Sequence, residues 1–362
     1  MARMRQALVS STLGRLVVAS HVSIPAPEQG EMLCQTAAVG LNPGDVKFSD
    51  YTSLQGTIGG FDFAGVVLQV GPGVTRFKAG DRVAGFAHGY DSNNKSSGAF
   101  ADVVLAVEDL TLKLPHDWTF EQGATLGTIV ATAGMALSHY LDIPLPEADS
   151  ERTNATGGKT SDQDGEYVLV SGAATATGMV ATQLLRLAGF RPVGTCSPRS
   201  AELVRSLGAV ATLDYRSPTC GADIRSLTGN SLTRVLDCVT SAETMAMCYS
   251  AIGSKGGRYV ALDPVSTHVK YTRRDVSADW PMALAIFGHP VRLAGVYGRP
   301  ATPALRGLGA RIFCMAEALI ERGELRGPPF QVRKGGLAAV DRGIEDLRKG
   351  RAKGEKLVYP LA

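Results

Sequence analysis

The chain has 362 residues, of which 44% are hydrophobic and 20% are charged, and its formal net charge is +3. This composition is ordinary for a soluble globular protein, and the length is sufficient for two domains with separate cores. The charge is too mild to indicate a nucleic-acid-binding surface, and the basic residues are not interleaved with aromatic ones. We therefore expect no nucleic-acid partner.

The sequence favours a cytoplasmic protein. No apolar run approaches the roughly 18 residues that a membrane span needs, so no membrane contact is expected. The basic segment 1–9 is not followed by the apolar stretch of a secretory signal. The absence of a C-x-x-C pair argues against a disulfide framework and a structural zinc site, so we expect buried thiols in a reducing compartment. The six cysteines are Cys34, Cys196, Cys220, Cys238, Cys248 and Cys314.

The N-terminal third has the pattern of a β-domain. Strand-like runs punctuated by Gly and Pro are predicted at 37–41, 65–70, 82–86 and 101–105, which is typical of an antiparallel barrel or sandwich. A long buried helix is predicted over 120–141. The following segment, 144–166, is polar and poor in apolar residues, and we predict an exposed, mobile insertion there.

A strand, a tight turn and a helix are predicted from residue 167 to residue 188. Such a unit directs the first N–H groups of the helix at an anion above the strand, most often a pyrophosphate. Gly172 and Gly178 occupy positions of close backbone approach, whereas Thr175 and Ala176 depart from the glycine fingerprint. An ordinary strand-to-helix turn is the alternative.

The next strand, predicted at 192–196, ends in Ser-Pro-Arg-Ser rather than in the acidic residue that would bind the 2′-hydroxyl of NAD. Two hydroxyls and the guanidinium of Arg199 suit a 2′-phosphate, which indicates NADPH. The alternative is that Arg199 is a solvated residue in the first turn of a helix.

Strands and helices alternate through the second half of the chain. Further strands are predicted at 211–214, 234–237 and 257–262, with a helix at 201–207, which indicates a doubly wound parallel sheet. The C-terminal part is predicted to contain helices at 313–319 and 338–348 and a final strand at 356–359.

In this order, the segments 41–47, 61–67, 77–83, 98–102 and 354–358 resemble the medium-chain dehydrogenase/reductase superfamily. The resemblance implies an α/β protein with a GroES-like antiparallel β-barrel domain over 1–127, completed by 317–362. A Rossmann NADP(H)-binding domain over 128–316 would carry the insertion 144–166.

Within that superfamily, the chain resembles the fungal trans-acting enoyl reductases of highly reducing polyketide synthases, the lovastatin type. The segments 174–177, 195–198, 213–216, 251–253 and 297–300 carry this likeness. It implies a monomer that works with such a synthase, or with a synthase fused to a nonribosomal peptide synthetase, and with its acyl carrier protein.

The resemblance also implies chemistry without zinc. Phe61 stands where zinc-dependent relatives have a histidine ligand, and a phenylalanine ring cannot bind a metal. Asp62, which follows it, is expected to be a structural hydrogen-bonding acid. Reduction of a polarised carbon–carbon double bond in a polyketide thioester is the reaction expected of a metal-free member.

By the same resemblance, Lys47 is the candidate catalytic residue, because an ammonium group there would bind the nicotinamide ribose or the oxygen of the developing enolate. A surface lysine without function is the alternative. The residues expected to contact NADPH are Gly44, Asp45, Val46, Lys47, Ala174, Thr175, Ala176, Thr177, Ser197, Pro198, Arg199, Ser200, Tyr215, Leu262, Asp263, Leu357 and Val358.

Two small, apolar stretches are expected to contact the acyl chain, and ordinary helix core is the alternative for both. They consist of Thr128, Ile129, Val130, Ala131, Thr132, Ala133, Gly134 and Met135, and of Ala283, Leu284, Ala285, Ile286 and Phe287. The rival functions are a quinone or free-enal oxidoreductase of the same superfamily and a non-catalytic NADPH-binding partner protein.

Overall fold

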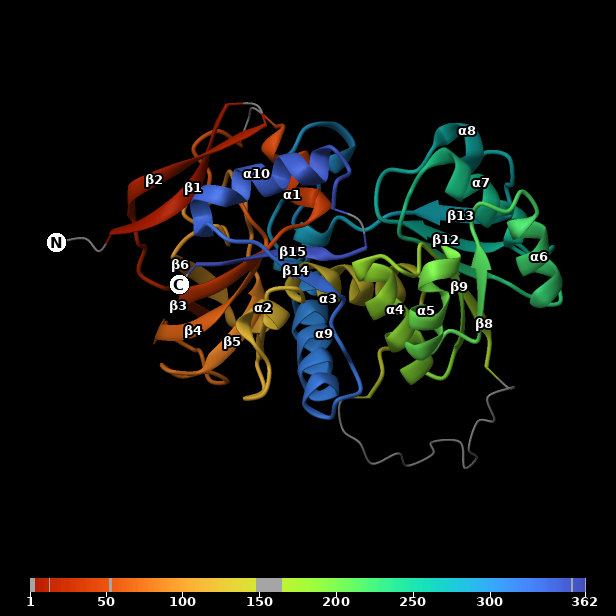
Figure 1. Cartoon of the computed structure of the whole chain (residues 1–362), viewed down its shortest axis with the longest axis horizontal. Coiled ribbons are helices and arrows are strands. Elements are labelled where there is room, and N and C mark those ends of the chain that lie inside the picture. The colour runs from red at the N-terminus through yellow and green to blue at the C-terminus, as the bar shows by residue number, and fades with distance from the viewer. Residues whose placement is uncertain (1–3, 13, 52–53, 148–164, 353, 362) are drawn as a thin grey trace. The chain divides into compact units, whose positions relative to one another are not determined.

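The computed structural model describes residues 4–12, 14–51, 54–147, 165–352 and 354–361, and the chain forms two compact units (Figure 1). Most of the predicted insertion, residues 148–164, lies outside the described residues. Unit 1 consists of Met1–Ala131, Leu284–Glu321 and Gly327–Ala362, and unit 2 of Thr132–Ala283 and Arg322–Arg326.

Unit 1 is built mainly from antiparallel strands. Its seven-stranded sheet has the order β14-β15-β3-β4-β5-β7, with β6 paired to β3, and β1 and β2 form a separate hairpin. The strands are β1 (Met4–Thr12), β2 (Arg15–Ser23), β3 (Glu31–Gly40), β4 (Asp62–Val70), β5 (Arg82–Phe86), β6 (Val103–Val107), β7 (Thr111–Lys113), β14 (Phe330–Val332) and β15 (Lys356–Pro360).

Small side chains fill one part of the core of unit 1. Ala38, Ala64 and Ala84, on three adjacent strands, pack with Leu114 and Val358 and are all buried. The helical elements of this unit are α1 (Pro43–Ser49), η2 (Glu108–Leu110), α2 (Phe120–Gly123), η5 (Ala283–Phe287), η6 (Gly295–Tyr297), α9 (Pro303–Glu321) and α10 (Gly336–Arg348), while α3 (Gly127–Met135) crosses into unit 2.

Unit 2 is a parallel sheet of six strands in the order β10-β9-β8-β11-β12-β13. The order reverses between β8 and β11, and ligands of such sheets bind at that switch point, outside the carboxyl ends of the strands. The strands are β8 (Tyr167–Ser171), β9 (Arg191–Cys196), β10 (Ala211–Asp214), β11 (Arg234–Asp237), β12 (Gly257–Ala261) and β13 (Val276–Asp279).

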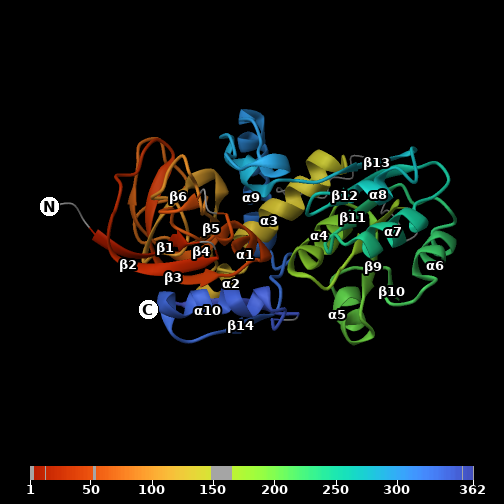
Figure 2. The ribbon, with the colours of Figure 1, turned by 90° about the horizontal axis from the view of Figure 1, so that it is seen from above.

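Helices gather around this sheet in Figure 2. Residues of α6 and α7 pack on one face of the sheet with Leu169, Val193 and Val235. On β9, Gly194 faces the opposite way, where an added Cβ would come within 2.9 Å of Val204 on α5. The elements are η3 (Ala136–Tyr140), α4 (Ala176–Leu187), η4 (Pro198–Ser200), α5 (Ala201–Ser206), α6 (Cys220–Leu227), α7 (Ala242–Ala251) and α8 (Thr267–Lys270).

The expected pairing of a β-domain with a doubly wound parallel sheet is confirmed. The domain bounds inferred from the sequence assign residues 284–316 to the nucleotide-binding domain, whereas in the structure Leu284–Glu321 packs within unit 1. Two ion pairs at 2.8 Å connect α9 to this unit: Arg306 with Asp109, and Arg76 with Glu317.

One local prediction was wrong, and one hairpin was not predicted. The helix expected over 120–141 is divided into α2, α3 and the π-helical η3. At the break, Gly127 passes so close to β5 and β4 that an added Cβ would lie 2.8 Å from Oδ1 of Asp62. The hairpin β1–β2 was missed because most side chains of β2 are exposed, so the strand has no apolar alternation.

Candidate functional site

The predicted pyrophosphate-binding turn joins β8 to α4 in unit 2. Gly172 has a φ of +72°, a conformation that glycine adopts without strain. The neighbouring strand β9 supports the turn through Thr195, whose hydroxyl accepts from the N–H of Gly172 at 3.1 Å and whose carbonyl accepts from Ala173 at 2.9 Å. The turn therefore has a defined shape before any ligand binds.

The N-terminus of α4 lies directly against this turn. A Cβ added at Gly178 would lie 2.9 Å from Cα of Ala173 and closer still to the carbonyl oxygen of Gly172. Thr175 is the N-cap, and its hydroxyl oxygen accepts from the N–H of Gly178 at 3.1 Å. The positive end of the 12-residue helix α4 therefore lies at the carboxyl edge of the sheet, and helix ends of this kind favour negatively charged groups.

The predicted 2′-phosphate residues follow β9, the adjacent strand. Ser197, Pro198, Arg199 and Ser200 form the short turn η4, and the hydroxyl oxygens of Ser197 and Ser200 are 3.3 Å apart. Arg199 is exposed. The structure therefore brings together the two hydroxyls and the guanidinium-bearing residue that the sequence singled out.

Tyr215 follows β10, the next strand in the sheet, and is half exposed. Beside it, Nη2 of Arg216 lies 2.8 Å from the carboxylate of Asp214. Hydrogen bonds from Arg216 lower the pKa of Asp214 below its usual value. Tyr215, one of the residues expected to contact NADPH, is therefore flanked by an exposed ion pair.

Asp237, at the end of β11, has a structural role that the sequence analysis missed. Its fully buried carboxylate accepts hydrogen bonds from the hydroxyls of Thr244 at 2.7 Å and Tyr259 at 2.8 Å, and from the N–H of Val239 at 3.0 Å. These bonds shape the loop after β11, next to the switch point. An acid at the end of a predicted strand was the available signal.

Thr240, in the same loop, has a φ of +58°, which is unusual for a β-branched residue. Its hydroxyl oxygen accepts from the N–H of Leu262 at 3.0 Å. Leu262 and Asp263, both half-buried, are therefore connected to the β11 loop at the carboxyl edge of the sheet. Backbone strain of this kind is most often found at functional sites.

The other predicted cofactor residues lie in unit 1. Asn42 is the N-cap of α1, and Pro43 is its first helical residue. The carboxylate of Asp45 accepts from the N–H of Asn42 at 2.8 Å and closes a capping box. Along this helix Gly44 and Val46 are half-buried and Lys47 is exposed.

Asp45 is fully buried. Burial raises the pKa of its carboxyl group well above the usual range, and the nearby charge of Asp62 adds to this effect. One carboxyl oxygen, Oδ1, has no hydrogen-bond partner within the part of the chain that the structure describes. The side chain of Asp45 is thus committed to the helix cap, and any contact with a cofactor would come from its backbone.

Asp62 is the structural acid that was expected. It is fully buried and forms an ion pair with Lys356. The same carboxylate accepts from Nδ2 of Asn42 at 2.9 Å, and from both the N–H and the hydroxyl of Thr128 at 2.6 Å. We refer to Asn42, Asp62, Thr128 and Lys356 as the Asp62 cluster.

The residues predicted to contact the acyl chain are largely buried. On α3, only Thr128 and Thr132 are partly exposed, and they are one helical turn apart. On η5, the ring of Phe287 packs 5.2 Å from Phe86 and 4.9 Å from His88. Substrate contact by these stretches remains a prediction. Those that are buried are Ile129, Val130, Ala131, Ala133, Gly134, Met135, Leu284, Ala285, Ile286 and Phe287, whereas Ala283 is half-buried.

Leu357 and Val358 lie on β15, deep within unit 1. Both side chains are buried, the carbonyl of Leu357 accepts from the N–H of Leu41 at 2.9 Å, and Val358 pairs with Gly40. The strand is thereby joined to the segment that leads into α1. Within unit 1, Leu357 and Val358 therefore lie next to the residues that lead into α1.

Phe61 belongs to an aromatic cluster, with ring centroids 5.3 Å from Phe48 and 5.5 Å from Tyr90. Among the residues that the structure describes, no three His, Cys, Asp or Glu side chains come together as a metal-binding group. The cysteines are unpaired thiols; Cys314 is exposed and Cys238 is partly buried, in contrast to the expectation of uniformly buried thiols.

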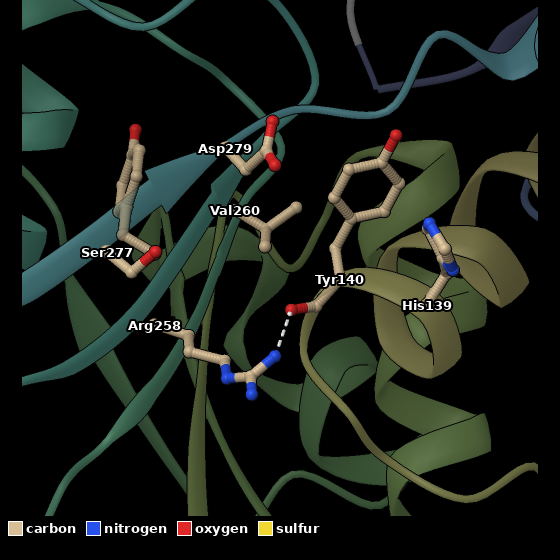
Figure 3. Close-up of a pocket in the computed structure, with 7 residues that line it drawn as sticks. His139, Tyr140, Arg258, Val260, Ser277 and Asp279 are labelled. Atoms are coloured by element: carbon tan, nitrogen blue, oxygen red, sulfur yellow. Dashed lines mark hydrogen bonds between the residues drawn. The ribbon is translucent and has the colours of Figure 1, made fainter.

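A separate pocket in unit 2 is shown in Figure 3. Nη1 of Arg258 donates to the carbonyl of Tyr140 at 3.3 Å across it. The lining residues are His139, Tyr140, Arg258, Tyr259, Val260, Ser277 and Asp279. They come from η3 and from within β12 and β13, whereas the predicted cofactor residues of unit 2 follow the ends of strands, so this pocket contains none of them.

None of the helices in the described part of the chain is long and apolar enough to cross a membrane. The basic residue Arg273 donates to the carbonyls of Tyr249 at 3.0 Å, Ile252 at 2.6 Å and Gly253 at 2.7 Å. Arg273 therefore caps the end of α7 rather than presenting its charge to a partner.

Comparison with known proteins agrees with this architecture. A family model described as "Alcohol dehydrogenase GroES-like domain" matches residues 28–116, and one described as "Zinc-binding dehydrogenase" matches residues 176–270. The crystal structure of CurK enoyl reductase, at 23% identity, superposes with a TM-score of 0.74 over 99% of this chain and 100% of that one. The chain belongs to the medium-chain dehydrogenase/reductase superfamily.

Sequence relatives define the family more closely. The trans-enoyl reductase grgB of Penicillium sp is 48% identical, with 98% of each chain covered, and a trans-enoyl reductase of Gibberella fujikuroi is 46% identical, with 99% of each covered. The chain belongs to the fungal trans-enoyl reductases. As a member of this family it is an oxidoreductase that acts on a carbon–carbon double bond and uses a nicotinamide cofactor.

Proposed function

We propose that the protein is a trans-acting, NADPH-dependent enoyl reductase that reduces the α,β-double bond of a polyketide thioester on an acyl carrier protein, without zinc, during secondary-metabolite biosynthesis. The likeness to a trans-enoyl reductase at 48% identity over 98% of both chains carries the proposal. Its partners would be a highly reducing polyketide synthase, or a synthase fused to a nonribosomal peptide synthetase, and the carrier protein. We propose that it acts as a monomer in the cytoplasm.

The choice of NADPH is supported by the residues around η4. Two hydroxyls 3.3 Å apart and the exposed Arg199 follow the strand whose end meets the ribose in this fold. An arginine offers several N–H donors to a phosphate and, unlike an acidic residue, does not repel it. The turn before α4 would bind the diphosphate that both nicotinamide cofactors share.

The proposal of zinc-free chemistry is supported by Phe61, which stands where zinc-dependent relatives have a histidine ligand, and by Asp62 beside it. Phe61 is buried in an aromatic cluster, and the acid beside it, Asp62, is engaged by Lys356, Asn42 and Thr128. Neither side chain offers a ligand to zinc in this arrangement.

Bound NADPH would supply a hydride to the β-carbon of the substrate, and a proton must then be added at the α-carbon; the chain's own residues would bind and orient the reactants. The N-terminus of α4 would bind the diphosphate and Ser197 to Ser200 the 2′-phosphate, which orients the cofactor. The ammonium group of Lys47 would stabilise the negative charge that develops on the thioester oxygen, or bind the nicotinamide ribose. Apolar side chains of α3 and η5 would exclude water from the acyl chain.

The test is oxidation of NADPH by the purified protein with a crotonyl or longer enoyl thioester, followed by absorbance at the cofactor band and by mass analysis of the saturated product. We expect turnover with thioesters and little with soluble quinones. A preference for quinones or free enals would replace the proposal by the rival oxidoreductase. Tight NADPH binding without reduction of any of these substrates would make the protein a non-catalytic binding partner.

Replacing Arg199 by alanine should weaken NADPH binding by about 10- to 100-fold, because a charge-assisted bond to a phosphate contributes about 1.5–3 kcal/mol. Binding of NADH, which has no 2′-phosphate, should change little. Titrations of both cofactors by fluorescence measure this difference. Arg205→Ala, which removes another exposed arginine near the end of α5, is the matched control. Equal losses for the two cofactors would mean that Arg199 does not bind the 2′-phosphate.

A further inference from the structure

Asp62, the first residue of β4, contacts three segments that are far from it in the sequence. Asp62 is separated by 20 residues from Asn42, by 66 from Thr128 and by 294 from Lys356. The side chains of Asp62 and Lys356 are 0% and 4% exposed. Lys356 also donates to Oδ1 of Asn42 at 2.7 Å, so Asn42, Asp62 and Lys356 contact one another in a closed triangle.

Asn42, Thr128 and Lys356 each stand at the start of a helix or strand whose residues we assign to the cofactor or substrate site. Asn42 is the N-cap of α1, which carries Lys47. Thr128 lies in the first turn of α3, at the start of the stretch proposed to contact the acyl chain. Lys356 is the first residue of β15 and directly precedes Leu357. One carboxylate therefore contacts the starting point of every predicted site segment of unit 1 except η5.

We propose that the Asp62–Lys356 ion pair is a positioning element of the active site, which sets the relative placement of α1, α3 and β15. This inference rests on the proposed function, since those segments matter only if they contact the cofactor and substrate. Asp62 and Lys356 are positioning residues in this account, because both are buried and act through Lys47 and the α3 residues.

The chemistry of the pair explains why a charge is needed. A carboxylate is purely an acceptor with about four lone-pair sites, and here Oδ1 accepts two donors from Thr128 while Oδ2 accepts from Asn42 and Lys356. An asparagine at position 62 would direct the N–H groups of its amide either at the donors of Thr128 or at those of Asn42 and Lys356. Loss of Lys356 alone would leave the buried carboxylate of Asp62 uncompensated.

The experiment compares Lys356→Met with Lys356→Arg and measures NADPH affinity, kcat, KM and thermal stability. With Lys356→Met we expect NADPH affinity to fall about tenfold and kcat/KM with a crotonyl thioester to fall about 10- to 100-fold, because small displacements of site segments have effects of this size. Lys356→Arg should restore most of both. If Lys356→Met does not fold, the double variant Asp62→Asn/Lys356→Gln, which buries no charge, takes its place.

Arg76→Met is the matched control, since it breaks another ion pair of unit 1, with Glu317, at residues outside the site. It should lower the melting temperature without changing NADPH affinity or kcat. The proposal is overturned if a folded Lys356 or double variant keeps NADPH affinity and kcat within about twofold of the unmutated protein, or if Arg76→Met causes equal losses. If the unmutated protein binds NADPH but reduces no thioester, the proposed function fails, and NADPH affinity still tests the Asp62 cluster.

Discussion

Replacing Lys47 by serine is expected to lower kcat/KM for an enoyl thioester by about 100- to 1,000-fold, the size of effect seen when one donor to a developing oxyanion is removed. Lys47 lies exposed near the end of α1, a helix whose start is capped by Asn42 and Asp45. The cap does not involve the lysine, so the free energy of unfolding should change by no more than about 0.5 kcal/mol. Steady-state kinetics and denaturant unfolding together measure the two effects.

Two variants complete that experiment. Lys78→Ser removes another exposed lysine of unit 1, outside the proposed site, and should leave kcat/KM unchanged. Lys47→Arg keeps the positive charge and should retain more activity than Lys47→Ser, although the guanidinium has a different shape. If Lys47→Ser reduces enoyl thioesters at the original rate, Lys47 is a surface residue, as most lysines are.

Replacing Gly178 by alanine is expected to weaken NADPH binding by at least about tenfold and to destabilise unit 2 by about 1–3 kcal/mol, the range typical of overpacking. The added Cβ would lie 2.9 Å from Cα of Ala173 and closer to the carbonyl oxygen of Gly172. The start of α4 must then move away from the turn, which displaces the N–H groups proposed to bind the diphosphate. Fluorescence titration and thermal unfolding measure both consequences.

Gly307→Ala is the matched control for this substitution. Gly307 lies inside α9, and an added Cβ there would meet nothing within 4 Å. Alanine is favoured over glycine in a helix interior by about 0.5–1 kcal/mol, so this variant should be slightly more stable and bind NADPH normally. Normal NADPH binding by Gly178→Ala would show that the close approach of α4 to the turn is not required for the cofactor.

The nucleotide-binding half was largely predictable because its signals are local. The apolar run of β8, the glycines of the turn and the helix-forming residues after Gly178 are adjacent in the chain, and the strand–turn–helix unit that they indicate is confirmed. The parallel sheet follows from the alternation of strands and helices. The placement of Ser197 and Ser200 beside one another also depended only on a four-residue turn.

The sequence misled where tertiary contacts override local preference. The helix expected over 120–141 is divided where Gly127 passes close to β4 and β5. The exposed strand β2 lacks the apolar alternation by which strands are recognised, whereas β13 alternates apolar and polar residues but is only four residues long.

The fold class, the family and the local turns could be inferred from the sequence because each rests on short segments, and the residues within each segment are near one another in the chain. Only the folded structure shows that Asn42, Thr128 and Lys356 meet at the buried carboxylate of Asp62, and that Tyr259 donates to the buried carboxylate of Asp237. Contacts across 294 residues leave no periodic pattern in a single sequence. They arise when strand pairing buries charged and polar side chains, because a buried group without a hydrogen-bond or ionic partner is energetically costly.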